Sequence, residues 1–224
     1  MTSATHHPVP EASRRPRVVG VVGGIGSGKS RVTRLLADAG AFVISGDELA
    51  HEALRQPEVR DQVVHRWGPQ VLGDDGEVRR RALGAIVFAD AAELRALEAL
   101  VHPWIERRIR EELDKARRDP STPLVVLDAA VMLEAGWDGV CDELVYVDVP
   151  RELRLRRIAE QRGWSEEEVA RRERAQLPPE VKARQADHVL DNAGSPDDLT
   201  RQVHALLRRW GVSATANVKG PSTP

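Results

Sequence analysis

Short apolar segments recur along the chain and predict the buried strands of a sheet. They are VVGVV at 18–22, AFVI at 41–44, LVVLD at 124–128, LVYVD at 144–148 and, as a weaker signal, HVLDN at 188–192. Apolar residues in these runs are continuous rather than alternating with polar ones, which is typical of parallel strands covered on both faces. The first two runs flank a helical segment that ends at Gly40, so the chain opens strand–helix–strand. This order predicts a parallel sheet with right-handed crossovers.

The stretch between the second and third strands is too long for a single crossover. Its helical segments are GDELAHEALR at 46–55, PEVRDQVVHRW at 57–67, RRRALGAIVF at 79–88 and a long one at 91–119. A turn-rich link, GPQVLGDDGEV, separates the second segment from the third. We therefore expect a helical insertion of about residues 47–119 within the sheet-forming core.

An arginine-rich segment, about residues 151–185, follows the fourth strand and predicts a charged helical hairpin. Gly163 interrupts it, and Ser165 with Glu168 predicts a capping box that starts the second helix. Glutamates balance most of the arginines on a solvated helix face. A lid that closes over ATP needs only one or two arginines to neutralise phosphoryl charge, and spacing alone does not select them.

Composition and charge narrow the class of protein. The 224 residues are 41% apolar and 30% charged with a formal net charge of −2, which is typical of a globular domain without a basic field for nucleic acid. A single cysteine, Cys141, fits a reducing compartment. No apolar run approaches the ~20 residues that span a bilayer. We expect a cytoplasmic protein, without membrane or nucleic-acid partners, whose folded domain at 17–212 lies between a disordered arm (1–16) and a disordered tail (213–224).

The segment GGIGSGKS at 23–30 fits the phosphate-binding pattern G-x-x-x-x-G-K-[ST], with an apolar strand directly before it and a helix directly after it. Glycines let consecutive backbone N–H groups turn inward around an anion, and the helix adds its N-terminal dipole. A purely structural glycine turn is the alternative, but chance rarely gives this pattern in this setting. The residues expected to bind ATP here are Gly24, Ile25, Gly26, Ser27, Gly28, Lys29, Ser30 and Arg31.

Lys29 is one of only four lysines among 33 basic residues. A lysine ammonium is a compact point charge that fits a backbone anion nest better than the wider fork of arginine. We expect Lys29 to reach the β- and γ-phosphates and the Ser30 hydroxyl to bind Mg²⁺. The pattern gives no physical reason for an arginine at the next position, Arg31.

Aspartates follow three of the predicted strands. Because the carboxyl ends of strands face the ligand crevice of a doubly wound sheet, Asp47 is a candidate to accept a hydroxyl proton or to help hold a metal. It also suits the N-cap of the next helix. Asp128 ends its strand as a Walker B acid does and is a candidate to hold Mg²⁺ through water, or a strand-end turn residue. Asp148 fits the turn role better.

A small-molecule kinase needs a base near the acceptor hydroxyl, a lid with arginines and an insertion that holds the substrate, and the sequence offers a candidate for each. No guanine-reading N-K-x-D motif follows, as a GTPase would need. Further segments make the chain similar to the dephospho-CoA kinase family. They are VISGDELAHE at 43–52, RRRALGAIVF at 79–88, LEALVHPWI at 97–105, LDAAVMLEAGW at 127–137, VYVDVPRELRLRRI at 145–158 and ADHVLDNAGSPDDL at 186–199. The resemblance covers about residues 17–208. It implies ATP-dependent phosphorylation of the ribose 3′-hydroxyl of dephospho-CoA, giving coenzyme A and ADP in the final step of coenzyme A biosynthesis.

The resemblance also implies an α/β P-loop NTPase fold, with three α/β/α layers around a parallel five-stranded sheet. The core would be formed by 17–46, 120–150 and 186–212. The insertion at about 47–119 would hold the acceptor, and the segment at about 151–185 would be the lid.

Residue roles also follow from the resemblance. Asp47 matches the family's catalytic aspartate, the second acid of a D-x-D motif, and Arg157 matches the lid arginine that meets the phosphates. His102, before Pro103, matches an acceptor-side position, although the pair could simply mark a helix end. Asn192 matches a position near the nucleotide, although it could be an ordinary turn asparagine.

The chain departs from the family pattern at a few positions. Ser45 replaces the first acid of D-x-D, Arg31 stands where threonine is usual, and Ala130 stands where the acid-led segment after the third strand usually has proline. The second lid arginine appears as Arg162, one place later than usual.

The expected protein is a monomeric or weakly associated kinase that uses MgATP and dephospho-CoA. The alternatives are another P-loop small-molecule kinase, such as a nucleoside monophosphate kinase, and a non-catalytic ATP-gated binding module, which Ser45 alone favours.

Overall fold

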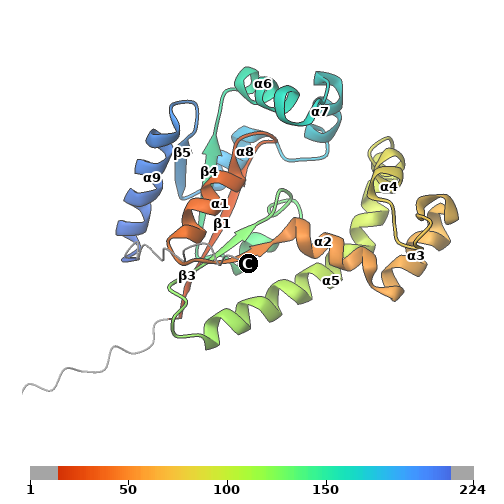
Figure 1. Cartoon of the computed structure of the whole chain (residues 1–224), viewed down its shortest axis with the longest axis horizontal. Coiled ribbons are helices and arrows are strands. Elements are labelled where there is room, and N and C mark those ends of the chain that lie inside the picture. Colours follow the sequence, from red (N-terminus) through yellow and green to blue (C-terminus); the bar gives the residue numbers. More distant parts are fainter. Residues whose placement is uncertain (1–14, 213–224) are drawn as a thin grey trace, which may run out of the picture.

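The computed structural model describes residues 15–212 and shows a sheet flanked by helices (Figure 1). The predicted tail at 213–224 and all but the last two residues of the predicted arm at 1–16 lie outside the described residues. The strands are β1 (Arg17–Gly23), β2 (Phe42–Ser45), β3 (Leu124–Asp128), β4 (Glu143–Asp148) and β5 (His188–Asp191). They are all parallel and run in the order β2-β3-β1-β4-β5. The predicted five-stranded parallel sheet is confirmed.

Helices cover both faces of the sheet because alternate residues of each strand point to opposite sides. The main covering helices are α1 (Lys29–Asp38), α5 (Ala91–Arg118), α8 (Pro179–Gln185) and α9 (Pro196–Arg209). On β1, Val19 and Val21 are fully buried on the side where α1 and α9 pack, whereas Val18 and Val22 face the side of α5 and α8. The predicted three-layer α/β/α architecture is confirmed.

Helices also fill the segment in which the sequence predicts an insertion (Figure 1). Besides α5 they are α2 (Gly46–Arg55), α3 (Pro57–Trp67) and α4 (Arg80–Val87). The link before α4 contains the short 3-10 turn η1 (Pro69–Val71) and an isolated antiparallel bridge between Leu72 and Val78. Apolar residues of all four helices join the core cluster on the α5 side of the sheet. The insertion therefore folds against the core, and its role in holding the acceptor stays a prediction.

The long helix α5 contains Pro103 in its interior and continues to Arg118. The alternative interpretation of His102 and Pro103 as a helix end is therefore wrong. Five buried apolar residues along the later part of α5 hold it against the core in spite of the proline. They are Val101, Ile105, Ile109, Leu113 and Ala116.

The arginine-rich segment forms α6 (Arg151–Arg162) and α7 (Glu166–Glu173), separated at Gly163, whose φ of 65° is the left-handed conformation of a helix C-cap. The Ser165 hydroxyl accepts a hydrogen bond from the Glu168 N–H, as predicted. The Glu168 carboxylate pairs with Arg172 at 2.8 Å instead of closing the predicted capping box. A complete box, Ser195 with Asp198, starts α9. No helix within residues 15–212 has the length and apolarity needed to cross a membrane.

Candidate active site

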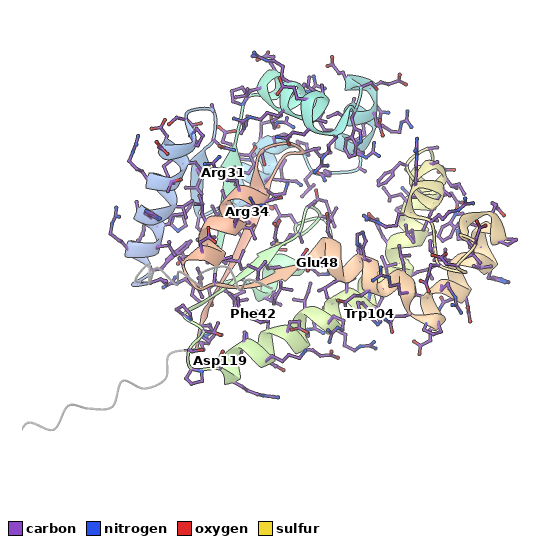
Figure 2. The ribbon with its side chains drawn as sticks, in the orientation of Figure 1. Arg31, Arg34, Phe42, Glu48, Trp104 and Asp119 are labelled. Atoms are coloured by element: carbon purple, nitrogen blue, oxygen red, sulfur yellow. The ribbon has the colours of Figure 1, made fainter. Side chains whose placement is uncertain are left out.

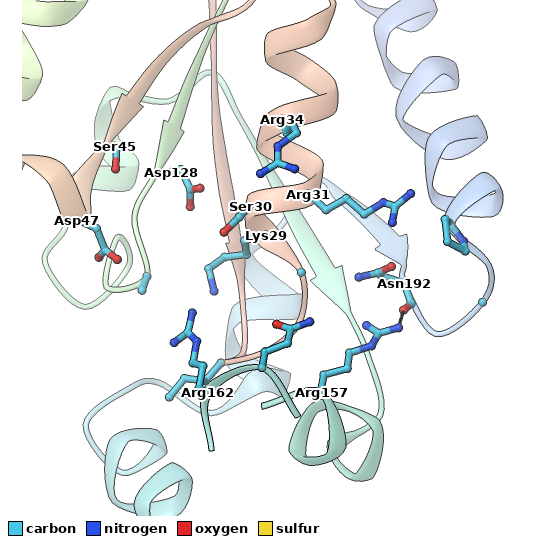
Figure 3. Close-up of a pocket in the computed structure, with 17 residues that line it drawn as sticks. Lys29, Ser30, Arg31, Arg34, Ser45, Asp47, Asp128, Arg157, Arg162 and Asn192 are labelled. Atoms are coloured by element: carbon cyan, nitrogen blue, oxygen red, sulfur yellow. Dashed lines mark hydrogen bonds between the residues drawn. The ribbon is translucent and has the colours of Figure 1, made fainter. Parts of the chain in front are cut away.

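A cavity of about 680 Å³ opens where β1, β2 and β3 end, beside α6 (Figure 3). This is the edge where the carboxyl ends of parallel strands place a ligand crevice. The lining residues are Ile25, Gly26, Gly28, Lys29, Ser30, Arg31, Arg34, Ser45, Asp47, Asp128, Ala130, Arg157, Gln161, Arg162, Asn192, Gly194 and Pro196. The structure thus brings most of the predicted site residues, from five separate parts of the chain, to one cavity.

The glycine-rich loop has the backbone shape of an anion nest. Gly26 and Gly28 have φ angles of 76° and 91°, in the left-handed region that other residues avoid. The Ser27 N–H bonds to the Gly24 carbonyl at 3.1 Å, which closes the turn. Gly28 is the N-cap of α1 and supplies no side-chain cap, so the first N–H groups of α1 remain available to an anion. Gly24 and Ser27 belong to this loop but do not line the cavity.

Lys29 crosses the loop and points into the cavity (Figure 3). Its Nζ donates to the carbonyls of Gly23 at 3.0 Å and Gly24 at 3.3 Å. Burial lowers the pKa of Lys29 to about 8, the Asp128 carboxylate opposes this shift, and the positive charges of Lys182 and Arg162 add to it. A phosphate bound beside this ammonium would stabilise its charged form and raise its pKa again.

Asp47 lies in the first turn of α2, but it is not the N-cap. Ser45 is the N-cap, with its hydroxyl accepting from the Glu48 N–H at 3.2 Å. The alternative role of Asp47 as a helix cap is therefore wrong, and Ser45 has a structural role of its own. Within residues 15–212 the Asp47 carboxylate has no hydrogen bond or ion pair, and it faces the cavity (Figure 3).

Asp128 ends β3 directly beside Ser45 of β2 in the sheet. Its Oδ2 accepts a hydrogen bond from the Thr33 hydroxyl at 2.9 Å. Burial raises the pKa of Asp128, while the Thr33 bond and the Lys29 charge oppose that shift. The carboxylate is therefore held by one oxygen at the edge of the cavity, and a cation there would stabilise its charged form.

The residues present fit the Mg²⁺ that accompanies ATP. The Ser30 hydroxyl and the Asp128 carboxylate are hard oxygen donors that both line the cavity. No group of three or more His, Cys, Asp or Glu side chains in the described part of the chain is arranged to hold a metal. Mg²⁺ needs only one or two protein oxygens when substrate phosphates and water supply the rest.

Two arginines of α6 make structural contacts. Arg154 is 5% exposed, donates to the Ile25 carbonyl at 3.0 Å and pairs with Glu173 of α7 at 2.8 Å. Arg151 pairs with the same glutamate at 3.3 Å and with Glu166 at 2.7 Å. These contacts join α6 to α7 and dock both helices on the glycine-rich loop.

Two other arginines of α6 face the cavity. Arg157 lines it, and its Nη2 donates to the Asn192 carbonyl at 2.9 Å. Arg162 points into the space between Lys29 and Asp47 (Figure 3) and makes no ion pair within residues 15–212. Four arginines of α6 therefore divide into a structural pair, Arg151 and Arg154, and a cavity pair, Arg157 and Arg162.

Asn192 holds the glycine-rich loop from the other side. It is 7% exposed, its Nδ2 donates to the Ser27 carbonyl at 2.7 Å, and its N–H bonds to the Asp148 carbonyl at 2.9 Å. A side chain at Gly28 would collide with the Asn192 amide. Asn192 is thus a support for the loop as well as part of the cavity wall, which is more than a turn asparagine does.

His102 does not line this cavity. It lies half-buried on α5, with its ring edge-on to Trp137 at 5.1 Å between centroids, and burial lowers its pKa. Its predicted contact with the acceptor stays a prediction.

Sequence reasoning missed several residues of the site. Arg34 and Gln161 line the cavity three and four residues after Arg31 and Arg157, so helix spacing would have found them. Arg31 and Arg34 both project from α1 (Figure 2). Lys182 was missed although lysine is rare in this chain, the same signal that marked Lys29.

Lys182 is a buried cation near the site. It is 1% exposed, and its Nζ lies 2.8 Å from Glu134 Oε1 and 3.2 Å from the Ala130 carbonyl. Glu134 also accepts from the Leu177 N–H at 2.8 Å. These contacts tie α8 and the segment before it to the loop after β3, where Ala130 lines the cavity.

Comparison with known proteins gives a consistent result. A family model described as dephospho-CoA kinase matches residues 17–198. A dephospho-CoA kinase of Symbiobacterium thermophilum is 42% identical over 193 residues, covering 86% of this chain and 80% of the relative. A dephospho-CoA kinase of Thermus thermophilus is 41% identical over 209 residues, covering 93% and 97%.

Solved structures agree. A crystal structure of a Thermus thermophilus protein is 40% identical, with a TM-score of 0.72, and the match covers 88% of this chain and 98% of that one. A dephospho-CoA kinase from Campylobacter jejuni, at 23% identity and a TM-score of 0.64, covers 86% and 96% and supports the same fold.

Proposed function

The chain belongs to the dephospho-CoA kinase family, and we propose that its cavity transfers the γ-phosphoryl group of MgATP to the ribose 3′-hydroxyl of dephospho-CoA. The products are coenzyme A and ADP. The observation that carries the assignment of this site is that Lys29 and the Asp47 carboxylate, which has no partner within residues 15–212, line one cavity. A phosphate donor site and a proton acceptor for a hydroxyl are thereby combined.

The glycine-rich loop binds the nucleotide. Its backbone N–H groups and the N-terminus of α1 surround the phosphates, and Lys29 places its ammonium beside the β- and γ-phosphates. The Ser30 hydroxyl and Asp128, the latter through water, would hold the Mg²⁺ that accompanies the phosphates. This ion neutralises charge on them when it is bound.

Asp47 acts on the acceptor. Its carboxylate accepts a hydrogen bond from the 3′-hydroxyl and orients an oxygen lone pair toward the γ-phosphorus. As the new O–P bond forms, the hydroxyl proton passes to Asp47 and the bond to the ADP oxygen breaks. Helices α2 to α5 supply the rest of the acceptor site, and His102 is a candidate contact there.

The lid neutralises charge on the transferring group. Lys29 approaches from the loop, while Arg157 and Arg162 approach from α6. Cations fixed around a developing charge lower the barrier without reorganising during the reaction. Catalysis in this site is therefore mainly positioning and electrostatics, with Asp47 as the group that moves a proton.

An acceptor panel tests the proposal. Purified protein is given MgATP with dephospho-CoA, AMP, CMP or no acceptor, and ADP and phosphorylated product are measured. We expect turnover with dephospho-CoA alone, with one coenzyme A formed per ADP. Turnover with a monophosphate would make the chain a nucleotide kinase, and intact ATP binding without turnover would make it a binding module.

The proposal includes a monomeric or weakly associated protein of the cytosol. The residues assigned to the reaction line one cavity of a single chain. Sedimentation velocity on the purified protein measures the state directly, and activity proportional to protein concentration is the expected kinetic counterpart.

A further inference from the structure

Arg162 reaches the cavity from an unexpected position on α6. A helix rotates by about 100° per residue, so side chains five residues apart, such as Arg157 and Arg162, project roughly 140° apart. Both nevertheless line the same cavity, whereas Gln161, four residues after Arg157, does so as helix spacing predicts. Arg162 is the last residue of α6, and its side chain is exposed. A contact outside the helix can therefore set the direction of its guanidinium.

That contact is an aromatic ring two residues along the chain. The Arg162 guanidinium carbon lies 5.0 Å from the centroid of the Trp164 ring. Gly163, in the left-handed conformation, turns the chain between them and brings Trp164 back toward the end of α6. A cation within about 6 Å of an indole face is attracted by the ring quadrupole, most strongly for tryptophan.

Trp164 also contacts Arg172 of α7, which in turn contacts the insertion. The guanidinium carbon of Arg172, on α7, lies 3.9 Å from the Trp164 centroid and 5.3 Å from that of Phe88 at the end of α4. Phe88 is 36% exposed, and its contact with Arg172 connects the end of α4 to α7. Trp164, by contrast, is only partly exposed, and the guanidinium carbons of Arg162 and Arg172 lie 5.0 and 3.9 Å from its ring centroid.

A stack of cation–ring contacts runs from Arg162 through Trp164 and Arg172 to Phe88. Its two arginines differ in whether an ion pair compensates their charge. Arg172 forms an ion pair with Glu168 at 2.8 Å, which compensates its charge. Arg162 has no such partner within residues 15–212, and its charge helps to lower the pKa of Lys29 across the cavity. The stack therefore fixes the direction of the Arg162 guanidinium without neutralising it.

We propose that Trp164 is a positioning residue for phosphoryl transfer, which holds the Arg162 guanidinium against the transferring phosphate. Arg172 links Trp164 to Phe88, so the same stack joins the lid to the helices expected to hold the acceptor. This inference rests on the proposed function, in which Arg162 contacts the phosphates.

A double-mutant cycle tests the proposal. Arg162→Ala, Trp164→Ala and the double variant are compared for kcat, for KM and for the dissociation constant of MgATP. We expect Trp164→Ala to lower kcat roughly 5- to 30-fold, and to add less than about twofold when Arg162 is already alanine. Trp164→Phe should recover most of the loss, since phenylalanine keeps an aromatic face.

Matched variants separate positioning from lid stability. Arg172→Ala removes the link to Phe88 and should lower kcat a fewfold, whereas Arg171→Ala, on the adjacent exposed position of α7, should leave kcat unchanged. Thermal unfolding of each variant is recorded. Equal losses from Trp164→Ala with and without Arg162, or an unchanged kcat in Trp164→Ala, overturn the proposal.

The binding measurement keeps this test separate from the proposed function. If the wild-type protein binds MgATP but phosphorylates no dephospho-CoA, the proposed function fails, and the dissociation constants alone decide about Trp164. Arg162→Ala, Trp164→Ala and the double variant should then weaken MgATP binding by the same factor. Additive effects of the two single changes on that constant overturn the proposal as well.

Discussion

The glycine-rich loop and the lid both bring positive charge to one cavity, but they do so by different means. In the loop the shape is mainly local, because glycine φ angles and the start of α1 place Lys29, while Asn192 and Arg154 support two of the loop carbonyls from outside. In the lid, partners that are distant in the sequence decide where each arginine side chain points. Arg154 is directed to the Ile25 carbonyl and Glu173, Arg157 to the Asn192 carbonyl, and neither choice follows from spacing.

This difference explains why the loop can be recognised from eight residues of sequence, whereas the arginines of α6 that face the cavity cannot. The loop depends on backbone angles that only particular residues allow. The lid depends on which of many equivalent arginines meets which carbonyl or carboxylate after the chain has folded. Substitutions in the two regions should therefore differ in size and in kind.

The largest effect should come from Lys29→Met. Methionine keeps most of the volume of the buried side chain but removes the ammonium, so the fold should persist while kcat/KM falls roughly 10³-fold. Lys115→Met is the matched control, since Lys115 is on the surface of α5 and 59% exposed. Steady-state kinetics and thermal unfolding of both variants give the measurement. A loss of less than tenfold in kcat/KM for Lys29→Met would contradict the claim that the loop supplies the main positive charge of the site.

A smaller loss should follow from Arg157→Met in the lid. The variant loses one charge-assisted contact to the phosphates, which corresponds to roughly 10- to 100-fold in kcat/KM. Arg156→Met, an exposed neighbour on the same helix, should behave as the wild type does. If both variants lose activity equally, the lid acts through its overall charge and not through the arginine that faces the cavity.

The pH dependence of MgATP binding should show the lowered pKa of Lys29, about 8. Below that pH the ammonium is charged and binds phosphate, and above it free Lys29 loses its proton, so the dissociation constant should rise with pH. The limit is about tenfold per pH unit while the complex keeps the proton. Calorimetry between about pH 7.5 and 9.5 measures this rise, which Lys29→Met should abolish.

The smallest effects should come from the helix caps. Ser195→Ala breaks the complete capping box of α9 in the core and should cost about 1 kcal/mol of unfolding free energy. Ser165→Ala removes only the single N-cap bond of α7 in the lid and should cost less. Urea unfolding measures both costs, and kcat should stay unchanged for Ser195→Ala. A larger cost for Ser165→Ala would mean that the lid, rather than the core, limits stability.

Local sequence signals predict much of the fold. The ends of α2 and α3 match the prediction because Pro57 starts one helix directly after the other has ended at Arg55. The strands follow from continuous apolar runs, because such runs are typical of parallel strands that are buried on both faces of a sheet. The glycine-rich loop and Asp47, two residues after the end of β2, follow from the same kind of local signal.

The rest depends on tertiary contacts. The predicted capping box of α7 is incomplete because Arg172 takes the Glu168 carboxylate, and Ser45, which replaces an expected acid, becomes the N-cap of α2. Lys182 pairs with Glu134 across 48 positions of the chain, and no pattern near either residue indicates that bond. Sequence reasoning finds groups that chemistry needs, but it does not find the partners that hold them.

The account as a whole rests on Asp47 as the group that acts on the acceptor hydroxyl, between the loop and the lid. The most direct test is a single-turnover experiment on Asp47→Asn with MgATP and dephospho-CoA, together with its MgATP dissociation constant. Asparagine keeps the shape and a hydrogen-bonding oxygen but cannot take up the proton, so transfer should slow by about 10²- to 10⁴-fold while MgATP binds within about twofold of the wild type. An unchanged rate of transfer, or a loss of MgATP binding, would contradict the account.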